Sequence, residues 1–205
     1  MSESSDNPAT LAAYEHNIQE YIDGSPQGVM PPVKDWIDTV LTLLVAPHRI
    51  LEIGSANGRD ADYIESRGYT VERTDAVTGF VELLQLHGHQ ARRLNALTDD
   101  FGGPYELIFA DAVFVHFTSF ELMRILASVR RSLSPNGLLA FSLKEGDGSE
   151  LKIIKLTAPR FFQYWKEDAM HALLAECGYK VVSFKKFRGN DGQNRLQFIA
   201  KAKNL

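Results

Sequence analysis

The residues with the clearest chemical potential lie in the stretch Arg49-Ile-Leu-Glu-Ile-Gly-Ser-Ala-Asn-Gly58. It reads as a short buried strand with an acid near its end, followed by a tight turn whose glycines begin a helix. Glycine has no Cβ, so the backbone at Gly54 and Gly58 can come close to a ligand. Open α/β folds bind ligands at the carboxyl ends of their strands. We therefore expect a small-molecule site at this turn.

The spacing of the turn disfavours two kinds of phosphate site. A dinucleotide fingerprint, Gly-x-Gly-x-x-Gly, would need glycines where the chain has Ala56 and Arg59. A P-loop would need a lysine followed by Ser or Thr, and the turn has no such lysine. The remaining pattern is Glu-x-Gly-x-Ala-x-Gly, which an ordinary strand–turn–helix corner would also produce.

From Glu52 to Gly58 this pattern resembles the first motif of class I S-adenosylmethionine (SAM)-dependent methyltransferases, usually Asp/Glu-x-Gly-x-Gly-x-Gly. The resemblance implies that Glu52, Gly54, Ser55, Ala56 and Gly58 form a cofactor-binding loop for SAM, with S-adenosylhomocysteine as the product. Alanine stands in place of the middle glycine. Its methyl group is tolerable at Ala56 unless φ is positive there.

Polar residues end the next two predicted strands. Asp75 follows Gly54 by about twenty residues, the spacing at which a carboxylate reaches ribose hydroxyls. The resemblance assigns it the same role, with Ala76 beside it, although a turn aspartate is the alternative. Asn95 stands where the family usually has Asp for the adenine amino group, and its amide oxygen can still accept a hydrogen bond. A loop asparagine is the alternative there.

The resemblance extends to further residues around the cofactor. It places the backbone N–H of Ala96 near the adenine ring and Leu97 over the ring face. Asp111 ends the fourth predicted strand, and the resemblance implies that Asp111 and Ala112 lie along the methionine part of SAM. Together, these strand ends predict one continuous cofactor site.

Residues for the methyl acceptor are expected from three segments. The first is an N-terminal helix with Tyr14 and Tyr21. The second follows the fourth strand and contains His116, which has an ordinary pKa near neutral and is a candidate general base with Tyr14. The third is an aromatic insert with Arg160 and Tyr164, which resembles that of small bacterial methyltransferases of uncharacterised substrate. Arg160 can bind a carboxylate through its fork. Each of these side chains could instead serve packing or local pairing.

The order of predicted elements positions these residues. Residues 1–9 are expected to be disordered, and helices are expected at 10–22 and from 31 until Pro47 ends the second. Strands at 50–53, 70–74, 91–94, 107–110 and 138–143 then alternate with helices at 58–67, 80–86 and 118–133, the last opened by a Thr118–Glu121 capping box. A helix at 166–177 precedes strands at 181–187 and 196–201, which the intervening glycines predict to be a hairpin.

Strand–helix alternation predicts an α/β fold with a parallel sheet, and the hairpin predicts an antiparallel edge. The resemblance implies a Rossmann-like, mostly parallel seven-stranded sheet with helices on both faces. We expect one domain overall, with residues 1–48 as a helical lid and residues 49–205 as the SAM-binding part.

Composition narrows the functional classes. The chain has 205 residues, a formal net charge of −4 and one cysteine, Cys177. The acidic balance disfavours a nucleic-acid partner. A single cysteine excludes an internal disulfide and a cysteine-rich metal site, and we predict no metal. There is no membrane-spanning run, and the polar N-terminus is not a secretory signal, so a cytoplasmic location is expected.

Three functions stay open. The first is SAM-dependent methyl transfer to N or O of a small molecule. The second is a protein or RNA methyltransferase, which would lack a basic groove and has Asp111-Ala-Val-Phe114 where amino-methylating enzymes have Asn/Asp-Pro-Pro-Tyr/Phe. The third is a non-catalytic SAM-binding protein. The acceptor and the oligomeric state are not predicted.

Overall fold

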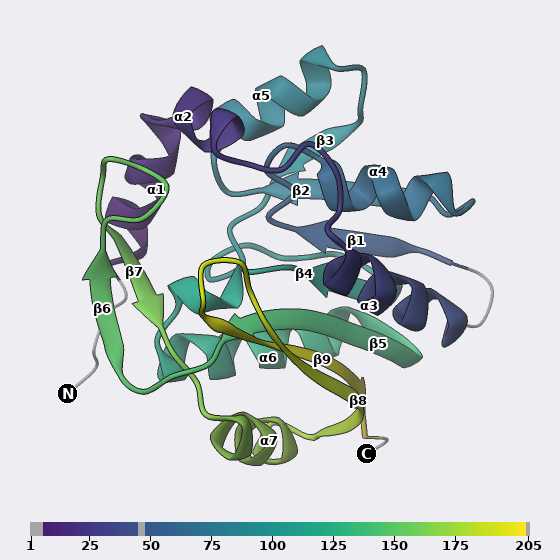
Figure 1. The fold of residues 1–205 in the computed structure, drawn as a ribbon. Helices are drawn as coiled ribbons and strands as arrows, with labels where there is room; N and C mark the ends of the chain where they lie inside the picture. The colour runs from purple at the N-terminus through teal and green to yellow at the C-terminus, as the bar shows by residue number, and fades with distance from the viewer. Residues whose placement is uncertain (1–5, 45–47, 204–205) are drawn as a thin grey trace.

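The centre of the molecule is a seven-stranded sheet with the strand order β3-β2-β1-β4-β5-β9-β8 (Figure 1). The computed structural model describes residues 6–44 and 48–203. β1 pairs in parallel with β2 and β4, and the pairs β2–β3 and β4–β5 are parallel as well. β9 is antiparallel to both β5 and β8. The predicted mostly parallel Rossmann-like sheet with a C-terminal antiparallel hairpin is confirmed.

Strands and helices alternate through the middle of the chain as predicted. In order they are β1 Ile50–Ile53, α4 Arg59–Ser66, β2 Val71–Asp75, α5 Thr78–Leu86, β3 Ala91–Arg93, β4 Tyr105–Ala110, the 3₁₀ helix Phe114–His116, α6 Ser119–Ser132 and β5 Leu133–Lys144. The capping box that begins α6 is present, because the Glu121 carboxylate accepts from Thr118 N at 2.9 Å and Thr118 Oγ1 accepts from Glu121 N at 3.3 Å. Residues 134–137, which lie between the predicted helix 118–133 and the predicted strand 138–143, already belong to β5.

The N-terminal segment differs from the prediction. Its helices are α1 Asn7–Glu15, α2 Ile18–Asp23 and α3 Pro31–Thr42. Helix α1 therefore begins within the segment expected to be disordered. The single helix predicted at 10–22 is divided into α1 and α2. The buried residues of α1 are Asn7, Thr10 and Ala13, so it lacks the apolar stripe that would have revealed its start. The helix end predicted at Pro47 lies outside the described residues.

The C-terminal third contains a hairpin that the sequence did not reveal. The elements are β6 Ser149–Lys152, β7 Arg160–Gln163, α7 Glu167–Glu176, β8 Tyr179–Arg188 and β9 Asn194–Ala202. β6 and β7 form a separate antiparallel pair that lies beside α1 (Figure 1). β6 escapes detection because it lies at the surface and its pattern Ser-Glu-Leu-Lys has no apolar alternation.

Helices cover both faces of the sheet, as predicted. α3 and α4 pack on one face, where Trp36 lies against Phe109 with ring centroids 4.8 Å apart. α6 and α7 pack on the other face through residues such as Leu126 and Met170. Within the described residues, no helix is both long enough and apolar enough to cross a membrane. The carboxyl ends of β1, β2, β4 and β5 are left facing the N-terminal helices.

Candidate active site

A cavity of about 630 Å³ lies at the carboxyl ends of the parallel strands. It is lined by strand ends of the sheet, by α1, by residues of and after α2, and by the tip of the β8–β9 hairpin. Its volume falls in the range of about 300–1,000 Å³ that is usual for ligand pockets. The predicted cofactor residues that line it are Gly54, Ala56, Asp75, Ala76, Asn95, Ala96, Asp111 and Ala112.

The glycine loop has three residues with positive φ. Gly54 has φ 75°, Ala56 has φ 47° and Gly58 has φ 81°. A Cβ added to Gly54 would lie 2.5 Å from Val113 Cγ2, and one added to Gly58 would lie 2.8 Å from Leu84 Cδ2. Gly58 does not line the cavity, so its role is to let the loop pack against α5. Ala56 carries the backbone strain that a glycine would avoid.

Asp75 fastens the end of β2 to this loop. Its Oδ2 accepts from Ala56 N and its Oδ1 from Val77 N, both at 2.9 Å. The side chain is buried, which raises its pKa to about 6 even though the backbone hydrogen bonds act in the opposite direction. Each carboxylate oxygen keeps further acceptor capacity toward the cavity, as a pair of ribose hydroxyls would require.

Two predicted cofactor residues support the loop from behind. Glu52 is 3% exposed and does not line the cavity; burial raises its pKa to about 8, and the nearby Asp60 adds to the rise. Its Oε2 has no hydrogen-bond partner among the described residues. Ser55 is also buried, and its hydroxyl accepts from Thr74 N at 3.2 Å. A buried carboxyl group needs hydrogen-bond donors, and the described residues supply them to Glu52 only in part.

At the end of β3, Asn95 is held between two neighbours. Its amide donates to Asn7 Oδ1 and accepts from Leu97 N, each at 3.0 Å. Asn95 and Ala96 line the cavity, whereas Leu97 packs against the core. The contact with Asn7 joins α1 to the predicted adenine side of the site.

Asp111, at the end of β4, also belongs to a network. It accepts from Ser142 Oγ and lies 3.4 Å from Arg59 Nη2. Burial and the nearby Asp60 raise its pKa to about 6. Ala112 follows with φ 56°, and its N–H donates to Ser142 Oγ at 2.9 Å. Ser142 on β5 thus fixes the segment that was predicted to lie along the methionine part of SAM.

The structure brings together three predicted acceptor-side residues. Tyr14 Oη and His116 Nε2 are 2.9 Å apart, and Arg160 Nη1 donates to Tyr14 Oη at 2.6 Å. Tyr21 stands edge-on to Tyr14 with ring centroids 5.6 Å apart. All four side chains line the cavity. Tyr164 does not; its hydroxyl donates to Glu150 Oε1 at 2.6 Å instead.

Hydrogen bonding fixes the tautomer of His116. Its Nδ1 is 2.7 Å from the Phe161 carbonyl oxygen, which can only accept, so Nδ1 carries the proton. Burial lowers the pKa of His116 to about 4, so the ring is neutral near pH 7. Nε2 must then accept from the Tyr14 hydroxyl. Burial raises the pKa of Tyr14, and Arg160 opposes that rise.

Several cavity residues were not singled out from the sequence, although Lys144 and Lys155 lie in the insert expected to contribute to the acceptor site. Lys144 ends β5, Lys155 lies between β6 and β7, and Arg188, Asp191 and Arg195 belong to the β8–β9 hairpin. Lys144 carried a usable signal, because it directly follows a predicted strand, as Asp75 and Asp111 do. The hairpin residues carried none, because only the tertiary fold brings that turn over the site.

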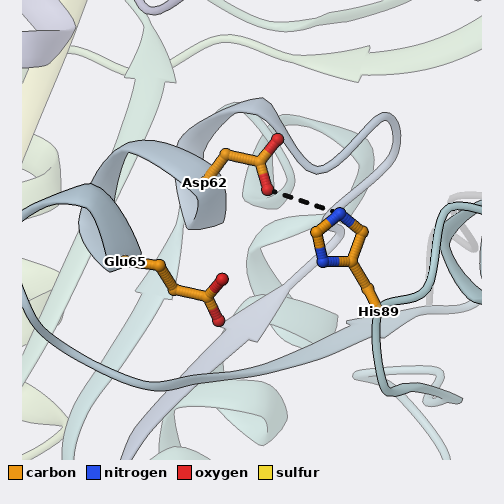
Figure 2. A group of neighbouring side chains, drawn as sticks. All are labelled: Asp62, Glu65 and His89. Carbon is orange, nitrogen blue, oxygen red and sulfur yellow. Dashed lines mark ion pairs between the residues drawn. The ribbon is translucent and has the colours of Figure 1, made fainter.

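A second group of titratable side chains lies outside the cavity. Asp62 and Glu65 of α4 and His89 have potential ligand atoms within 4.8 Å of one another (Figure 2). However, Arg73 donates to Asp62 at 2.7 Å and to Glu65 at 2.8 Å. The guanidinium already supplies the countercharge for both carboxylates, so we interpret the group as an ion-pair network linking α4 to β2.

Comparisons with known proteins identify the family and the fold of the chain. The chain matches the family described as a methyltransferase domain over residues 14–184. No curated protein sequence is significantly similar to it.

Among solved structures, Burkholderia thailandensis 1,6-didemethyltoxoflavin-N1-methyltransferase, with its substrate and S-adenosylhomocysteine bound, is 20% identical, with a TM-score of 0.75 over 100% of this chain and 92% of that chain. The CcbJ methyltransferase of Streptomyces caelestis is 13% identical, with a TM-score of 0.72 over 94% and 98%. The [4+2]-cyclase SpnF is 11% identical, with a TM-score of 0.70 over 98% and 97%. At these identities the structures show the fold, whereas the family match covers most of the sequence. The chain therefore belongs to the methyltransferase domain family and has the class I fold of SAM-dependent methyltransferases.

Proposed function

We propose that this protein transfers a methyl group from SAM to a nitrogen or oxygen atom of a small-molecule acceptor. One observation carries the proposal: the strand-end residues expected to hold the cofactor and the Tyr14–His116–Arg160 cluster line the same cavity. The family match supports the reaction class, and the toxoflavin-precursor methyltransferase among the structural neighbours lends support to a small acceptor.

The cofactor fits the polar groups at the strand ends. The Asp75 carboxylate would accept from the ribose hydroxyls, and Asn95 with Ala96 would face the adenine. Glu52 keeps one buried oxygen without a partner among the described residues, and this oxygen can organise the loop or accept through water from the cofactor's ammonium group. SAM supplies a methyl group already activated by its positively charged sulfur. The protein therefore has to align the acceptor, exclude water and remove a proton.

Tyr14 is placed to remove that proton. One lone pair of its oxygen accepts from Arg160, and another is free to accept from an acceptor N–H or O–H. Methylation makes the remaining N–H or O–H proton of the acceptor much more acidic, so even a weak base such as His116, with a pKa of about 4, can receive it. As Tyr14 takes this proton, it passes its own to His116 Nε2, whose partner nitrogen stays bonded to the Phe161 carbonyl. The Arg160 charge stabilises negative charge that develops on Tyr14 in between.

The N-terminal helices, within residues 1–48, act as the lid of this site. α1 is held at three places: Asn7 bonds Asn95, Thr10 Oγ1 accepts from Phe161 N at 3.1 Å, and Glu15 accepts from Thr78 N at 2.8 Å. A lid held in this way limits access of water to the reacting groups. It also favours a small acceptor over a protein or RNA chain, because the acceptor has to fit beneath it.

The reaction can be tested before the acceptor is identified. The purified protein is incubated with isotopically methyl-labelled SAM and a fractionated metabolite extract, and mass spectrometry detects compounds that gain one labelled methyl group. Calorimetry with SAM and S-adenosylhomocysteine runs in parallel. Labelled product that depends on Tyr14 supports the proposal. Cofactor binding without any product favours a non-catalytic SAM-binding protein, and labelled protein or RNA favours a macromolecular acceptor.

A further inference from the structure

The charged residues of the cavity are unbalanced in sign. Its lining contains six basic side chains and three acidic ones, in a chain whose formal net charge is −4. The acidic ones are Asp75, Asp111 and Asp191; the basic ones are Arg59, Lys144, Lys155, Arg160, Arg188 and Arg195. The excess is therefore a local feature of the site and not a reflection of overall composition.

Two of the basic side chains are neutralised by neighbours. Arg59 pairs with Asp60 at 2.8 Å and approaches Asp111, and Arg195 pairs with Asp191 at 2.6 Å. None of the other four forms an ion pair with a described residue: Arg188 lies exposed at the end of β8, and the other three are Lys144, Lys155 and Arg160. They come from the end of β5, from the β6–β7 connection and from β7, so three separate segments deliver uncompensated positive charge to one cavity.

Arg160 shows the imbalance most clearly, because it is only 3% exposed. Its guanidinium donates to the Tyr14 hydroxyl and to the Ile154 carbonyl, both of which are neutral. It also lies over the Tyr14 and Phe162 rings, 4.8 and 5.3 Å from their centroids. Burying a charge without a countercharge is costly, so an anion entering the cavity would be stabilised here.

The two lysines also lie over aromatic rings, although Lys144 is half-buried and Lys155 is exposed on one side. Lys144 Nζ lies 4.1 Å from the Phe162 ring centroid, and Lys155 Nζ lies 3.5 Å from that of Tyr21. Burial lowers the pKa of each lysine to about 8. For Lys144, the charges of Arg195 and Arg160 lower the pKa further, and Asp191 opposes them. For Lys155, the charges of Arg59 and Arg160 act in the same direction as burial. Arg160 thus repels both lysines. Lys155 also has φ 67°, a backbone conformation that is costly for a lysine.

The cofactor of the proposed function does not remove this excess. SAM carries a sulfonium and an ammonium group against a single carboxylate, so its binding adds net positive charge. The carboxyl groups near its expected position, Glu52, Asp75 and Asp111, lie at or beside the ends of β1, β2 and β4. Apart from the exposed Arg188 on β8, the unpaired cations lie at the end of β5 and in the β6–β7 segment. The compensating charge must come from another molecule.

We propose, on the basis of the proposed function, that the methyl acceptor is an anion, a small molecule with a carboxylate or comparably acidic group bound by Lys144 and Arg160 with Lys155. The anion sets the orientation of the acceptor, because Arg160 holds the Tyr14 hydroxyl as well. The Arg160 guanidinium thereby connects recognition of the charged group to the position of Tyr14, the proposed proton acceptor.

Matched acids and amides test the charge of the acceptor directly. The protein is saturated with S-adenosylhomocysteine, and the affinities of anthranilate against anthranilamide and of 4-hydroxybenzoate against 4-hydroxybenzamide are measured by calorimetry or ligand-observed NMR. We expect the acid of each pair to bind at least about tenfold more tightly, the scale of one charge-assisted contact. Lys144→Met should remove most of this preference, and Lys180→Met, which removes the same charge from an exposed position on β8, should leave it intact.

The cations could bind a carboxylate of the acceptor or the carboxylate of the cofactor itself, and the affinity for S-adenosylhomocysteine distinguishes these two cases. If Lys144→Met leaves that affinity within about threefold and removes the acid preference, the site belongs to the acceptor. If it weakens the cofactor product instead, the cations hold the cofactor's own carboxylate and the anionic-acceptor proposal is wrong, while the methyltransferase proposal stands. Acids that bind no better than their amides, or not at all, also overturn it. Failure to bind either SAM or its product would instead refute the proposed function.

Discussion

The Tyr14 hydroxyl is the atom whose removal tests the site most sharply. Tyr14→Phe keeps the ring and its edge-on contacts with Tyr21, Phe80 and His116, at centroid distances of 5.6, 6.2 and 5.6 Å. It removes only the oxygen between Arg160 Nη1 and His116 Nε2. The change therefore isolates hydrogen bonding and proton transfer from packing.

The magnitude follows from the groups left behind. Arg160 Nη1 loses its acceptor, and the buried Nε2 of His116 loses its donor. Leaving each group unsatisfied costs about 1–3 kcal/mol, so the free energy of unfolding should fall by about 2–6 kcal/mol. If Tyr14 accepts the acceptor's proton, turnover should also fall by about 10²–10⁴-fold, while the affinity for SAM stays close to that of the unchanged chain.

Tyr21→Phe provides the matched control. Tyr21 lines the same cavity, yet its hydroxyl makes no hydrogen bond to any described residue, so stability should change by less than about 1 kcal/mol. Urea unfolding, calorimetry with SAM and turnover of the acceptor are compared for both variants. Equal losses for Tyr14→Phe and Tyr21→Phe, or full turnover in Tyr14→Phe, would refute the assignment of the proton path.

Four further outcomes are expected. Asp75→Ala should weaken SAM binding by about 1.5–3 kcal/mol in calorimetry, the scale of hydrogen bonds to a charged group, and unchanged affinity would place the ribose elsewhere. Ala56→Gly should raise the free energy of unfolding by about 1 kcal/mol, because it relieves a positive φ; a loss of stability would contradict this. The pKa of His116 is about 4 in the fold against 6.5 in the unfolded chain, so its contribution to the free energy of unfolding is complete above pH 6.5 and is lost as pH falls to 4. In urea titrations across that window, the stability difference between the native chain and His116→Asn should shrink by about 3 kcal/mol. A constant difference would contradict this. Deleting residues 1–25 should leave the sheet folded by circular dichroism but strongly reduce turnover, and full turnover would show that α1 and α2 are not a lid.

The sheet and the strand ends that line the cavity could be predicted because their determinants are local. Polar residues stand at or just after the ends of several of these strands, Asp75 at β2, Asp111 after β4 and Lys144 at β5, and parallel strands bring those ends to one edge of the sheet. Asp75 and Asp111 could therefore be placed in one cavity from their positions alone. The capping box of Thr118 and Glu121 could be read for the same reason, since both partners lie within one turn of helix.

The cluster of Tyr14, His116 and Arg160 depends on long-range packing, which the sequence pattern does not encode. Tyr14, His116 and Arg160 meet only because α1 is clamped against β7, and the buried face of α1 is formed by small and polar residues. Tyr164 was expected in the same cavity from its place in the aromatic insert. It lies outside because its hydroxyl turns away to Glu150 on the β6 side of the hairpin, whereas Phe162 of β7 lines the cavity.

The Gly54–Gly58 loop also has a consequence for how such chains evolve and are found. All three residues at positions 54, 56 and 58 have positive φ, but an added Cβ would collide with a neighbouring side chain at the outer two, whereas Ala56 already accommodates one. Glycine at positions 54 and 58 therefore meets two requirements, a positive φ and the lack of space for a Cβ. At position 56 only the positive φ favours glycine, and its cost to alanine of about 1–2 kcal/mol is small enough to be offset elsewhere in the chain. Drift away from glycine is therefore expected first at the middle position. A search pattern that requires glycine at all three positions would overlook chains of this kind, whereas one that admits alanine in the middle follows the steric limits of the loop.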